Sequence, residues 1–232
     1  MKDLHQERDS RATGFTLKTQ TADLHDHLCT QLCEGELAPG DTLSIRKVAQ
    51  EYGCSTMPAR EALRWLVAEG ALEFIDSRRI IVPTVSRRRF EELLFARRQL
   101  ETELSRLAFP HLTEEDIETL ARIDDAIGDA IARGDMTAYM RGNYTFHFHI
   151  YQRSASRVLL PLVKVLWMQY GPSMRYIASL WENSTLEDDY HMQVIEALRH
   201  KDCERFCQAI GADIEQGIGL LTMQQTPKKT QV

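Results

Sequence analysis

No long apolar run occurs anywhere in the sequence. A membrane-spanning helix needs about 20 consecutive apolar residues, whereas the richest stretch, residues 158–168, is interrupted by Pro161 and Lys164. Residues 1–20 carry charges throughout and lack the apolar core of a secretion signal. We therefore expect a cytoplasmic protein with no membrane span, in which residues 1–20 form a polar disordered leader and residues 224–232 a polar tail.

Cysteine is scarce and follows no metal-binding or disulfide pattern. The chain has 5 cysteines, and none of them forms a Cys-x-x-Cys pair. Cys29 and Cys33 are four residues apart on a helix-like pattern, as are Cys203 and Cys207, and Cys54 stands alone. We expect buried, reduced thiols rather than a disulfide scaffold.

An overall positive charge is also lacking. The formal net charge is −6 at pH 7, which argues against a chain coated with basic residues for nucleic acid. Residues 44–89 are the exception, because nine Lys or Arg residues stand there against five acidic ones. A basic surface, if the protein has one, lies in that segment.

Glycine and proline become less frequent after residue 85. Before that point they separate short elements, and beyond it the sequence is a series of long stretches with the 3.6-residue period of helices. With 43% hydrophobic and 27% charged residues, the 232-residue chain is long enough for two modest globular domains. We predict one domain over residues 21–85 and a second over residues 86–223.

The first domain has the element order of a winged helix-turn-helix. Leu24, Leu28 and Leu32 mark one face of a first helix. The pattern then predicts helices over 44–52 and 55–70, the second capped by Ser55, and a β-hairpin wing from 72–75 and 80–82. In such a fold the N-terminal residues of the third helix are free to enter the major groove of DNA.

Four segments of this domain resemble the GntR family of bacterial transcription regulators. They read GELAPGDTL at 35–43, RKVA at 46–49, GCSTMPAREALRWL at 53–66 and EGAL at 69–72. The resemblance implies DNA binding, although Thr56 stands where the family usually has arginine and Arg79 where the wing usually has glycine. The candidate DNA-contacting residues are Arg46, Ser55, Thr56, Arg60, Arg64, Arg78 and Arg79.

The second domain is predicted to be an all-α antiparallel helical bundle. Six helices are expected, over 87–109, 114–133, 135–153, 156–180, 184–200 and 203–223. An Arg-x-x-Leu-Glu motif at residues 97–101, and Phe146-His147 followed by Ile150-Tyr151, resemble the FCD ligand-sensing domain. The number of helices is similar to that of its VanR-like branch. The expected fold class is therefore mainly α.

Polar residues interrupt the apolar faces of three of these helices. Asn143 and His147 lie one turn apart on such a face, and His191 and Asp213 lie on the apolar faces of the last two helices. A buried carboxylate needs a cation or several hydrogen-bond donors. Two interpretations stay open, namely a divalent metal site or a hydrogen-bonded polar core without metal.

The resemblance favours the metal. FCD domains that bind metal typically use an Asp-x3-His pair, a later histidine and a last histidine, and Asn143, His147, His191 and Asp213 fall at those positions. This implies a Zn site, with Ni or Mn as further options, whose formal charge of about +1 suits an anion. Arg97 is a candidate anchor for the carboxylate of an effector, unless it pairs with a neighbouring glutamate. Two further pocket candidates are Tyr170 and Arg175.

Together these patterns predict a sequence-specific transcription regulator rather than an enzyme. We expect a homodimeric repressor that binds a palindromic operator in double-stranded DNA and responds to a small carboxylate. A metal-dependent helical hydrolase is the main alternative, since His25-Asp26 occurs in one such class, but no matching ligands follow. A dimerising scaffold would leave the buried polar set unexplained.

Overall fold

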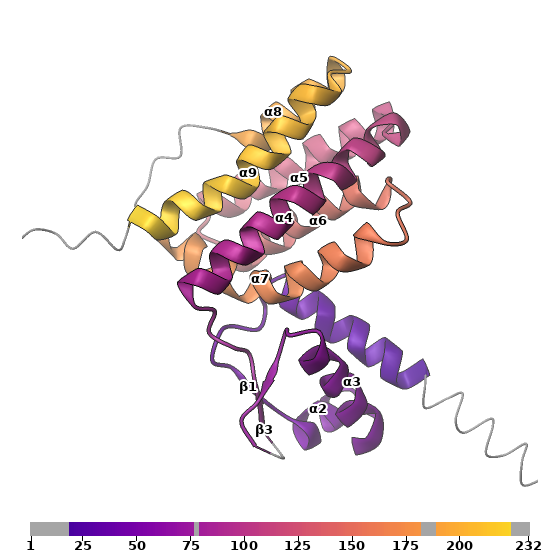
Figure 1. Cartoon of the computed structure of the whole chain (residues 1–232), viewed down its shortest axis with the longest axis vertical. Helices are drawn as coiled ribbons and strands as arrows, with labels where there is room; N and C mark the ends of the chain where they lie inside the picture. Colours follow the sequence, from indigo (N-terminus) through magenta and orange to yellow (C-terminus); the bar gives the residue numbers. More distant parts are fainter. Residues whose placement is uncertain (1–18, 77–78, 182–188, 224–232) are drawn as a thin grey trace, which may run out of the picture. The chain divides into compact units, whose positions relative to one another are not determined.

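The computed structural model describes residues 19–76, 79–181 and 189–223, with the backbone alone for 175–181 and 217–223 (Figure 1). The chain divides into two compact units. We call them the head unit, which comprises the chain up to Leu32 together with Leu37–Thr84, and the helical unit, which comprises Cys33–Glu36 and the chain from Val85 onward.

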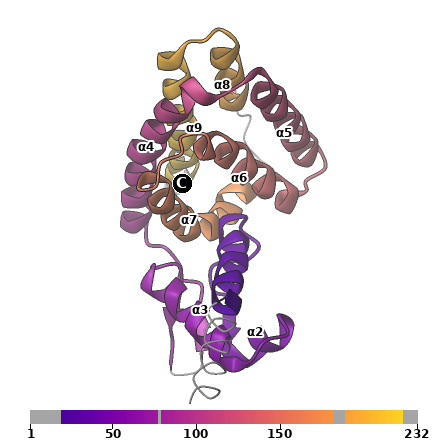
Figure 2. The same ribbon diagram turned by 90° about the vertical axis from the view of Figure 1, so that its right-hand side faces the viewer.

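In residues 19–76 and 79–84, the head unit contains three helices and a small antiparallel sheet. Its first helix spans residues 19–33, and α2 and α3 follow it side by side (Figure 2). The bounds are Ile45–Glu51 for α2, Thr56–Ala68 for α3, Thr42–Ser44 for β1, Glu73–Phe74 for β2 and Arg79–Ile81 for β3. The predicted winged helix-turn-helix is thus present.

The sheet has one strand more than the predicted hairpin. The strand order is β1-β3-β2, with Leu43 and Phe74 both opposite Ile80. Ser44, predicted as the first residue of a helix, instead ends β1 and caps α2 by accepting a hydrogen bond from the backbone of Lys47. A strand of three residues is too short to show alternation in the sequence, so only its pairing reveals it.

A glycine before α3 and the buried face of the helix determine its position. Gly53 has φ of +60°, a left-handed conformation that glycine adopts without strain, and it ends α2 as predicted. Ser55 lies at the N-cap of α3, but its hydroxyl makes no capping hydrogen bond, so this part of the prediction is wrong. The inner face of α3 is held instead by Leu63 and Leu66, which are fully buried.

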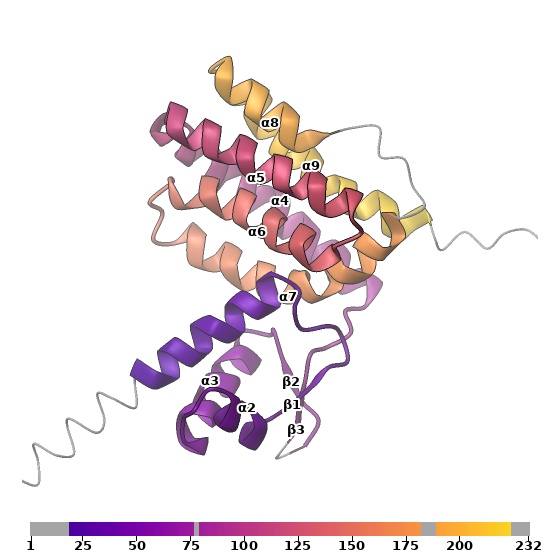
Figure 3. The ribbon, with the colours of Figure 1, turned by 180° about the vertical axis from the view of Figure 1, so that it is seen from behind.

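Over its described residues, the helical unit contains the six predicted helices and one short 3-10 turn. α5 and α6 lie side by side (Figure 3), α6 also packs against α4 and α7, and α9 packs against α4, α7 and α8. The bounds are Arg87–Ala108 for α4, Phe109–His111 for η1, Glu114–Ala132 for α5, Met136–Gln152 for α6, Leu159–Trp181 for α7, Tyr190–Arg199 for α8 and Cys203–Met223 for α9.

Differences from the predicted bounds concern mainly α7 and α8. α7 begins three residues later than expected, because Ala155 adopts a positive φ of 50° and a turn precedes the helix. The expected first residues of α8, 184–188, lie outside the described part of the chain. Among the described residues, no helix is long and apolar enough to cross a membrane.

The cysteines are free thiols, as predicted, but they are not all buried. Cys29, Cys33 and Cys207 are buried, whereas Cys54 and Cys203 are partly exposed. Burial raises the pKa of the Cys207 thiol to about 12, with Cys203 as the next cause. Cys207 is therefore a neutral packing residue at physiological pH.

Candidate metal centre and nucleic-acid interface

Three of the four predicted metal ligands come together in the helical unit. His147 on α6 and His191 on α8 are 1% and 8% exposed, and Asp213 on α9 has a side chain that is 19% exposed. One ligand atom from each of the three residues lies within 4.8 Å of the other two. The fourth predicted ligand, Asn143, is buried one turn before His147, and its amide nitrogen donates to Sδ of Met174 at 3.7 Å.

The tautomer of His147 follows from a chain of buried hydrogen bonds. The hydroxyl of Tyr151 donates to Oε2 of Glu101 at 2.6 Å and lies 3.1 Å from Nδ1 of His147. Because the tyrosine proton is directed at Glu101, the tyrosine oxygen accepts from Nδ1–H of His147. This network assigns the lone pair of the imidazole to Nε2, which lies 3.0 Å from Oδ2 of Asp213.

A carboxylate fixes the tautomer of His191. Nδ1 of His191 lies 3.1 Å from Oδ1 of Asp124 on α5, so the ring donates from Nδ1 and carries its lone pair on Nε2. Nε2 in turn lies 3.7 Å from Oδ1 of Asp213. A carboxylate that orients a histidine in this way is typical of metal sites.

The two Nε2 atoms are buried, and neither has a hydrogen-bond partner in the described part of the chain. For His147 the contact of 3.0 Å with Asp213 is therefore close but not oriented as a hydrogen bond. Two lone pairs that face a carboxylate repel it unless a metal ion lies among them or an Nε2 atom is protonated. The residues present thus fit a divalent metal ion held by two imidazoles and one carboxylate.

Electrostatics within the site favour an ionised Asp213. Burial opposes ionisation, but the pKa of the Asp213 carboxyl is nevertheless lowered, because His147, His191 and Arg97 lie near it. Burial also disfavours the charged form of His191, yet its pKa is raised because Asp124 and Asp213 outweigh that effect. An ionised carboxylate is the form that binds a metal.

Arg97 forms the salt bridge with a neighbouring glutamate that was predicted as the alternative to an effector contact. Its guanidinium is 3% exposed and its Nε donates to Oε1 of Glu101 at 2.6 Å. The guanidinium carbon also lies 4.2 Å from the centre of the Trp167 ring and 4.1 Å from that of the Tyr170 ring. Burial opposes the charge, but Glu101, Tyr170 and Tyr151 raise the pKa of Arg97. The side chain of Arg175 lies outside the described residues.

Sequence reasoning missed two positioning residues of this site. Asp124 and Tyr151 orient His191 and His147, and no local pattern singles out Asp124 from its neighbour Asp125. Glu101 is the neighbouring glutamate predicted as the alternative partner of Arg97, and it also accepts a hydrogen bond from Tyr151. The buried indole Nε1 of Trp167 also has no hydrogen-bond partner among the described residues, although its ring centre lies 5.5 Å from that of His147. Nε1 of Trp167 is thus a buried donor near His147 for which the described residues provide no acceptor.

The predicted DNA-contacting residues lie on the surface of the head unit. Six of the seven are exposed, namely Arg46, Ser55, Thr56, Arg60, Arg64 and Arg79, and the seventh, Arg78, lies outside the described residues. In α3, Thr56 and Arg60 are one turn apart on the exposed face. Met57, which sequence reasoning did not single out, is 62% exposed beside them.

Two of these arginines have acidic neighbours. Arg64 lies 3.6 Å from Glu61, and Nε of Arg79 donates to Asp76 at 2.8 Å. All of these side chains are largely exposed, so the pairs are weak and can exchange for phosphate contacts.

Comparison with known proteins matches both units. Residues 20–82 match the bacterial regulatory proteins of the gntR family, and residues 92–216 match the FCD domain. The HTH-type transcriptional regulator McbR of Escherichia coli K12 is 30% identical over 207 residues, covering 88% of this chain and 93% of the relative. A probable D-xylose utilization operon transcriptional repressor of Paenarthrobacter nicotinovorans is 26% identical, with 84% and 86% covered.

Solved structures show the same fold. E. coli McbR/YncC superimposes with a TM-score of 0.78 at 30% identity, covering 88% of this chain and 98% of that one. A putative GntR transcriptional regulator from Rhodococcus sp. RHA1 gives a TM-score of 0.70 at 17% identity, with the same coverage, and so shows a shared fold.

Proposed function

Because the chain belongs to the GntR family of bacterial regulators and carries an FCD domain, we propose that this transcription regulator is a metal-dependent repressor. It binds a palindromic operator as a homodimer, and a small carboxylate bound at the metal controls its operator affinity. The observation that carries this proposal is the convergence of three ligand atoms, two of them unpartnered imidazole nitrogens, in the unit that follows the head. Relatives and families are regulators and not enzymes.

In the DNA-binding step, Arg60 reads bases and the other exposed basic residues contact phosphate. Thr56 and Arg60 share the exposed face at the N-terminal half of α3, the part of a recognition helix that meets base edges. An arginine that reads guanine with two hydrogen bonds contributes about 1–3 kcal/mol of discrimination. Arg46 and Arg79 lie outside α3 and serve as positioning contacts.

The test uses an operator selected from a library of random duplexes with the wild-type protein. Arg60→Ala is expected to weaken binding to that operator by about 1–3 kcal/mol while retaining most of the affinity for unrelated DNA. Arg133→Ala is the matched control, since Arg133 is also exposed but belongs to the helical unit. Equal operator affinity of Arg60→Ala and wild type in an anisotropy titration contradicts the assignment of Arg60.

In the sensing step, His147, His191 and Asp213 hold a divalent ion, with Asn143 as the fourth proposed ligand. Nitrogen and carboxylate ligands suit Zn, and Ni or Mn are alternatives. When bound, the metal supplies a Lewis-acidic centre that an anionic ligand can complete. Tyr151 and Asp124 keep both histidines in the tautomer that exposes Nε2.

Metal analysis of the purified protein tests this step. About one equivalent per chain is expected in the helical unit, with a rise in melting temperature on adding Zn, and His191→Ala is expected to lose that equivalent and the part of the rise that it causes. His200→Ala is the matched control, because His200 is exposed at the end of the same helix. Unchanged metal content in His191→Ala, or no metal and no thermal shift in wild type, favours the hydrogen-bonded polar core instead.

Effector coupling requires a difference in affinity between two states. A carboxylate changes operator binding only if it binds the DNA-competent and incompetent dimers unequally. Titration of di- and tricarboxylates and sugar acids into the operator complex at fixed metal measures this difference. A ligand that raises the melting temperature but leaves operator affinity unchanged contradicts the proposed coupling, while it still agrees with ligand binding.

A further inference from the structure

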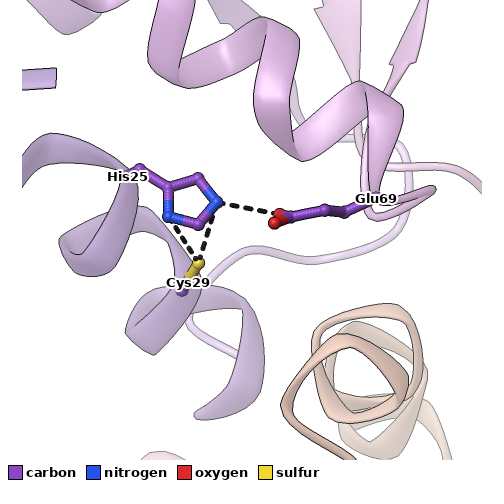
Figure 4. A group of neighbouring side chains, drawn as sticks. All are labelled: His25, Cys29 and Glu69. Atoms are coloured by element: carbon purple, nitrogen blue, oxygen red, sulfur yellow. Dashed lines mark hydrogen bonds and ion pairs between the residues drawn. The ribbon is translucent and has the colours of Figure 1, made fainter. Parts of the chain in front are cut away.

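His25 and Cys29 lie one turn apart on the first helix of the head unit. Residues at positions i and i+4 of a helix share a face, so the two side chains approach each other. Cys29 is fully buried and the side chain of His25 is 15% exposed. Figure 4 shows the thiol beneath the imidazole ring. The pair therefore presents one nitrogen and one sulfur ligand at the edge of the head core.

A carboxylate completes the group from a distant part of the chain. Glu69 is the C-cap residue of α3, and its Oε2 lies 2.8 Å from Nε2 of His25 (Figure 4). Its side chain is 30% exposed, so the group is open to solvent on the glutamate side. The ring of Trp65 packs edge-on against His25 with 5.6 Å between ring centres.

The three ligand atoms lie close enough to share one ion after a small rearrangement, because the nitrogen, sulfur and oxygen atoms all lie within 4.8 Å of one another. Sγ of Cys29 lies 3.5 Å from Nδ1 and 3.6 Å from Nε2 of His25, so the sulfur is off the direction of the Nε2 lone pair, and the imidazole must turn to share an ion with the thiolate. The distance of 2.8 Å between His25 and Glu69 must also widen by about half an ångström to hold a tetrahedral zinc ion. The glutamate side chain is 30% exposed and can move by that amount.

From these observations we propose that His25, Cys29 and Glu69 form a second metal site, in the head unit, that takes Zn²⁺ or an ion of similar softness. A thiolate and an imidazole select such ions over Mg²⁺ and Ca²⁺, which prefer oxygen ligands. Three protein ligands leave one position for water. The thiol loses its proton to solvent when the ion binds.

The site would join two elements that position the DNA-reading surface. His25 and Cys29 belong to the first helix, and Glu69 ends α3, so one ion ties α3 to the helix behind it. An ion that binds only the folded head stabilises it by mass action. This proposal is independent of the proposed metal in the helical unit, which has no sulfur ligand.

Cobalt substitution in the His191→Ala background distinguishes the two sites. Co²⁺ bound to a thiolate shows a sulfur-to-cobalt charge-transfer absorption in the near ultraviolet, which a site of nitrogen and oxygen ligands lacks. The full-length His191→Ala protein is expected to develop this absorption with about one equivalent of Co²⁺ and to lose it when Zn²⁺ is added. His191→Ala with Cys29→Ser is expected not to develop it.

Two further variants complete the design. Cys54→Ser is the matched control, because Cys54 is a partly exposed thiol of the same unit outside the cluster, and the absorption is expected to persist. Glu69→Gln keeps the size of the side chain and removes the ligand charge. Loss of an outer-shell partner alone weakens metal binding by about 10–100-fold, so Co²⁺ affinity is expected to fall by at least that factor.

Circular dichroism shows whether Cys29→Ser folds. The experiment tests the proposal in either case. The proposal is wrong if folded His191→Ala protein develops no charge-transfer absorption, or if the absorption survives in folded Cys29→Ser. If Cys29→Ser is unfolded, equal Co²⁺ affinity of Glu69→Gln and its parent overturns the site. In those cases His25 and Glu69 are an ion pair over a buried thiol.

Discussion

At the scale of single residues, the helical unit shows how hydrogen-bond partners fix the orientation of two buried histidines. Each of the two buried histidines uses Nδ1 in a hydrogen bond, with Tyr151 for His147 and Asp124 for His191. Both Nε2 atoms are thereby left as acceptors near Asp213. The partners, and not the histidines alone, make the group suitable for a cation.

Tyr151→Phe tests this role of the hydroxyl. The substitution removes the acceptor for Nδ1 of His147 and the donor to Glu101. We expect zinc affinity to fall by about 10–100-fold and the free energy of unfolding of the metal-free protein by about 1–2 kcal/mol. Competition with a chromophoric chelator measures the affinity, and urea unfolding the stability.

Tyr144→Phe is the control for the loss of a hydroxyl from the same helix. The Tyr144 ring packs against Phe148 with 4.3 Å between ring centres. Removing the Tyr144 hydroxyl leaves the contact between Tyr151 and Nδ1 of His147 in place. Equal zinc affinities of Tyr151→Phe and Tyr144→Phe argue that Tyr151 has no positioning role.

At the scale of elements, α4 carries two kinds of Arg–Glu pair with the same spacing. Arg97 and Glu101 are 3% and 0% exposed, whereas Arg88 and Glu92 are 90% and 66% exposed. Both pairs are four residues apart with Nε to carboxylate distances of 2.6 and 3.1 Å. Their energetic roles differ because only the buried charges have lost their water.

Glu101→Gln and Glu92→Gln measure that difference. Glu101→Gln leaves the charge of Arg97 buried without a counter-charge, which is expected to cost about 3 kcal/mol or more. Glu92→Gln removes a pair that solvent screens and is expected to cost less than about 0.5 kcal/mol. Chemical unfolding of the two variants gives both values, and similar losses speak against a structural role for the buried pair.

Asp116 joins α5 to the end of α6. It forms a capping box with Thr113 at the start of α5 and accepts hydrogen bonds from Arg153, with His149 at 2.9 Å. Burial works against ionisation, but the backbone of Thr113 and the side chain of Arg153 outweigh it, so the pKa of Asp116 lies below 3.8, its ordinary value. The folded state therefore favours the carboxylate.

The sign of the pH dependence follows from that shift. Because the pKa is lower in the folded state, the carboxylate stabilises the fold above about pH 4, and this contribution is lost as the pH falls below that value. Asp116→Asn is expected to reduce the free energy of unfolding near neutral pH by about 1–3 kcal/mol, and by progressively less below about pH 4.

Urea unfolding over a series of pH values checks this expectation. Asp125→Asn, an exposed residue of the same helix, is the control and is expected to show no such trend. A difference between Asp116→Asn and wild type that stays constant down to about pH 3 means that the Asp116 pKa is not lowered by folding.

At the scale of the whole molecule, the charge distribution sets how DNA is bound. The chain is acidic overall, so the attraction to DNA rests on local basic residues such as the exposed Arg60, Arg64 and Arg79 of the head unit. Affinity for DNA therefore depends on released counterions and falls with salt, with a slope of about 0.9 for each phosphate neutralised.

Arg64→Ala tests the phosphate contact and the number of copies on the operator together. A homodimer contributes two Arg64 side chains, so the salt slope is expected to decrease by about two, whereas one bound copy predicts about one. Anisotropy titrations at several salt concentrations measure the slope. Arg133→Ala serves as the unchanged control, and a slope equal to that of wild type removes Arg64 from the interface.

The sequence by itself determined most of the element order and the faces that matter. Helical periodicity placed His147, His191 and Asp213 on apolar faces, and the structure buries both histidines there and brings all three together. The order of the predicted helices and hairpin over residues 24–82 similarly predicted the winged helix-turn-helix. These features are local, because a period of 3.6 residues decides which face a side chain joins without knowledge of its neighbours.

Only the tertiary structure decided which residues meet across elements. β1 became visible through its pairing with β3, Asp124 through the packing of α5 beside α8, and Glu69 through its approach to His25 over 44 positions of sequence. Arg97 had two predicted partners, and the fold placed Glu101 against it. The physical reason is that contacts between elements depend on the packing of the whole core. A short stretch of sequence carries no information about the distances between residues of different elements.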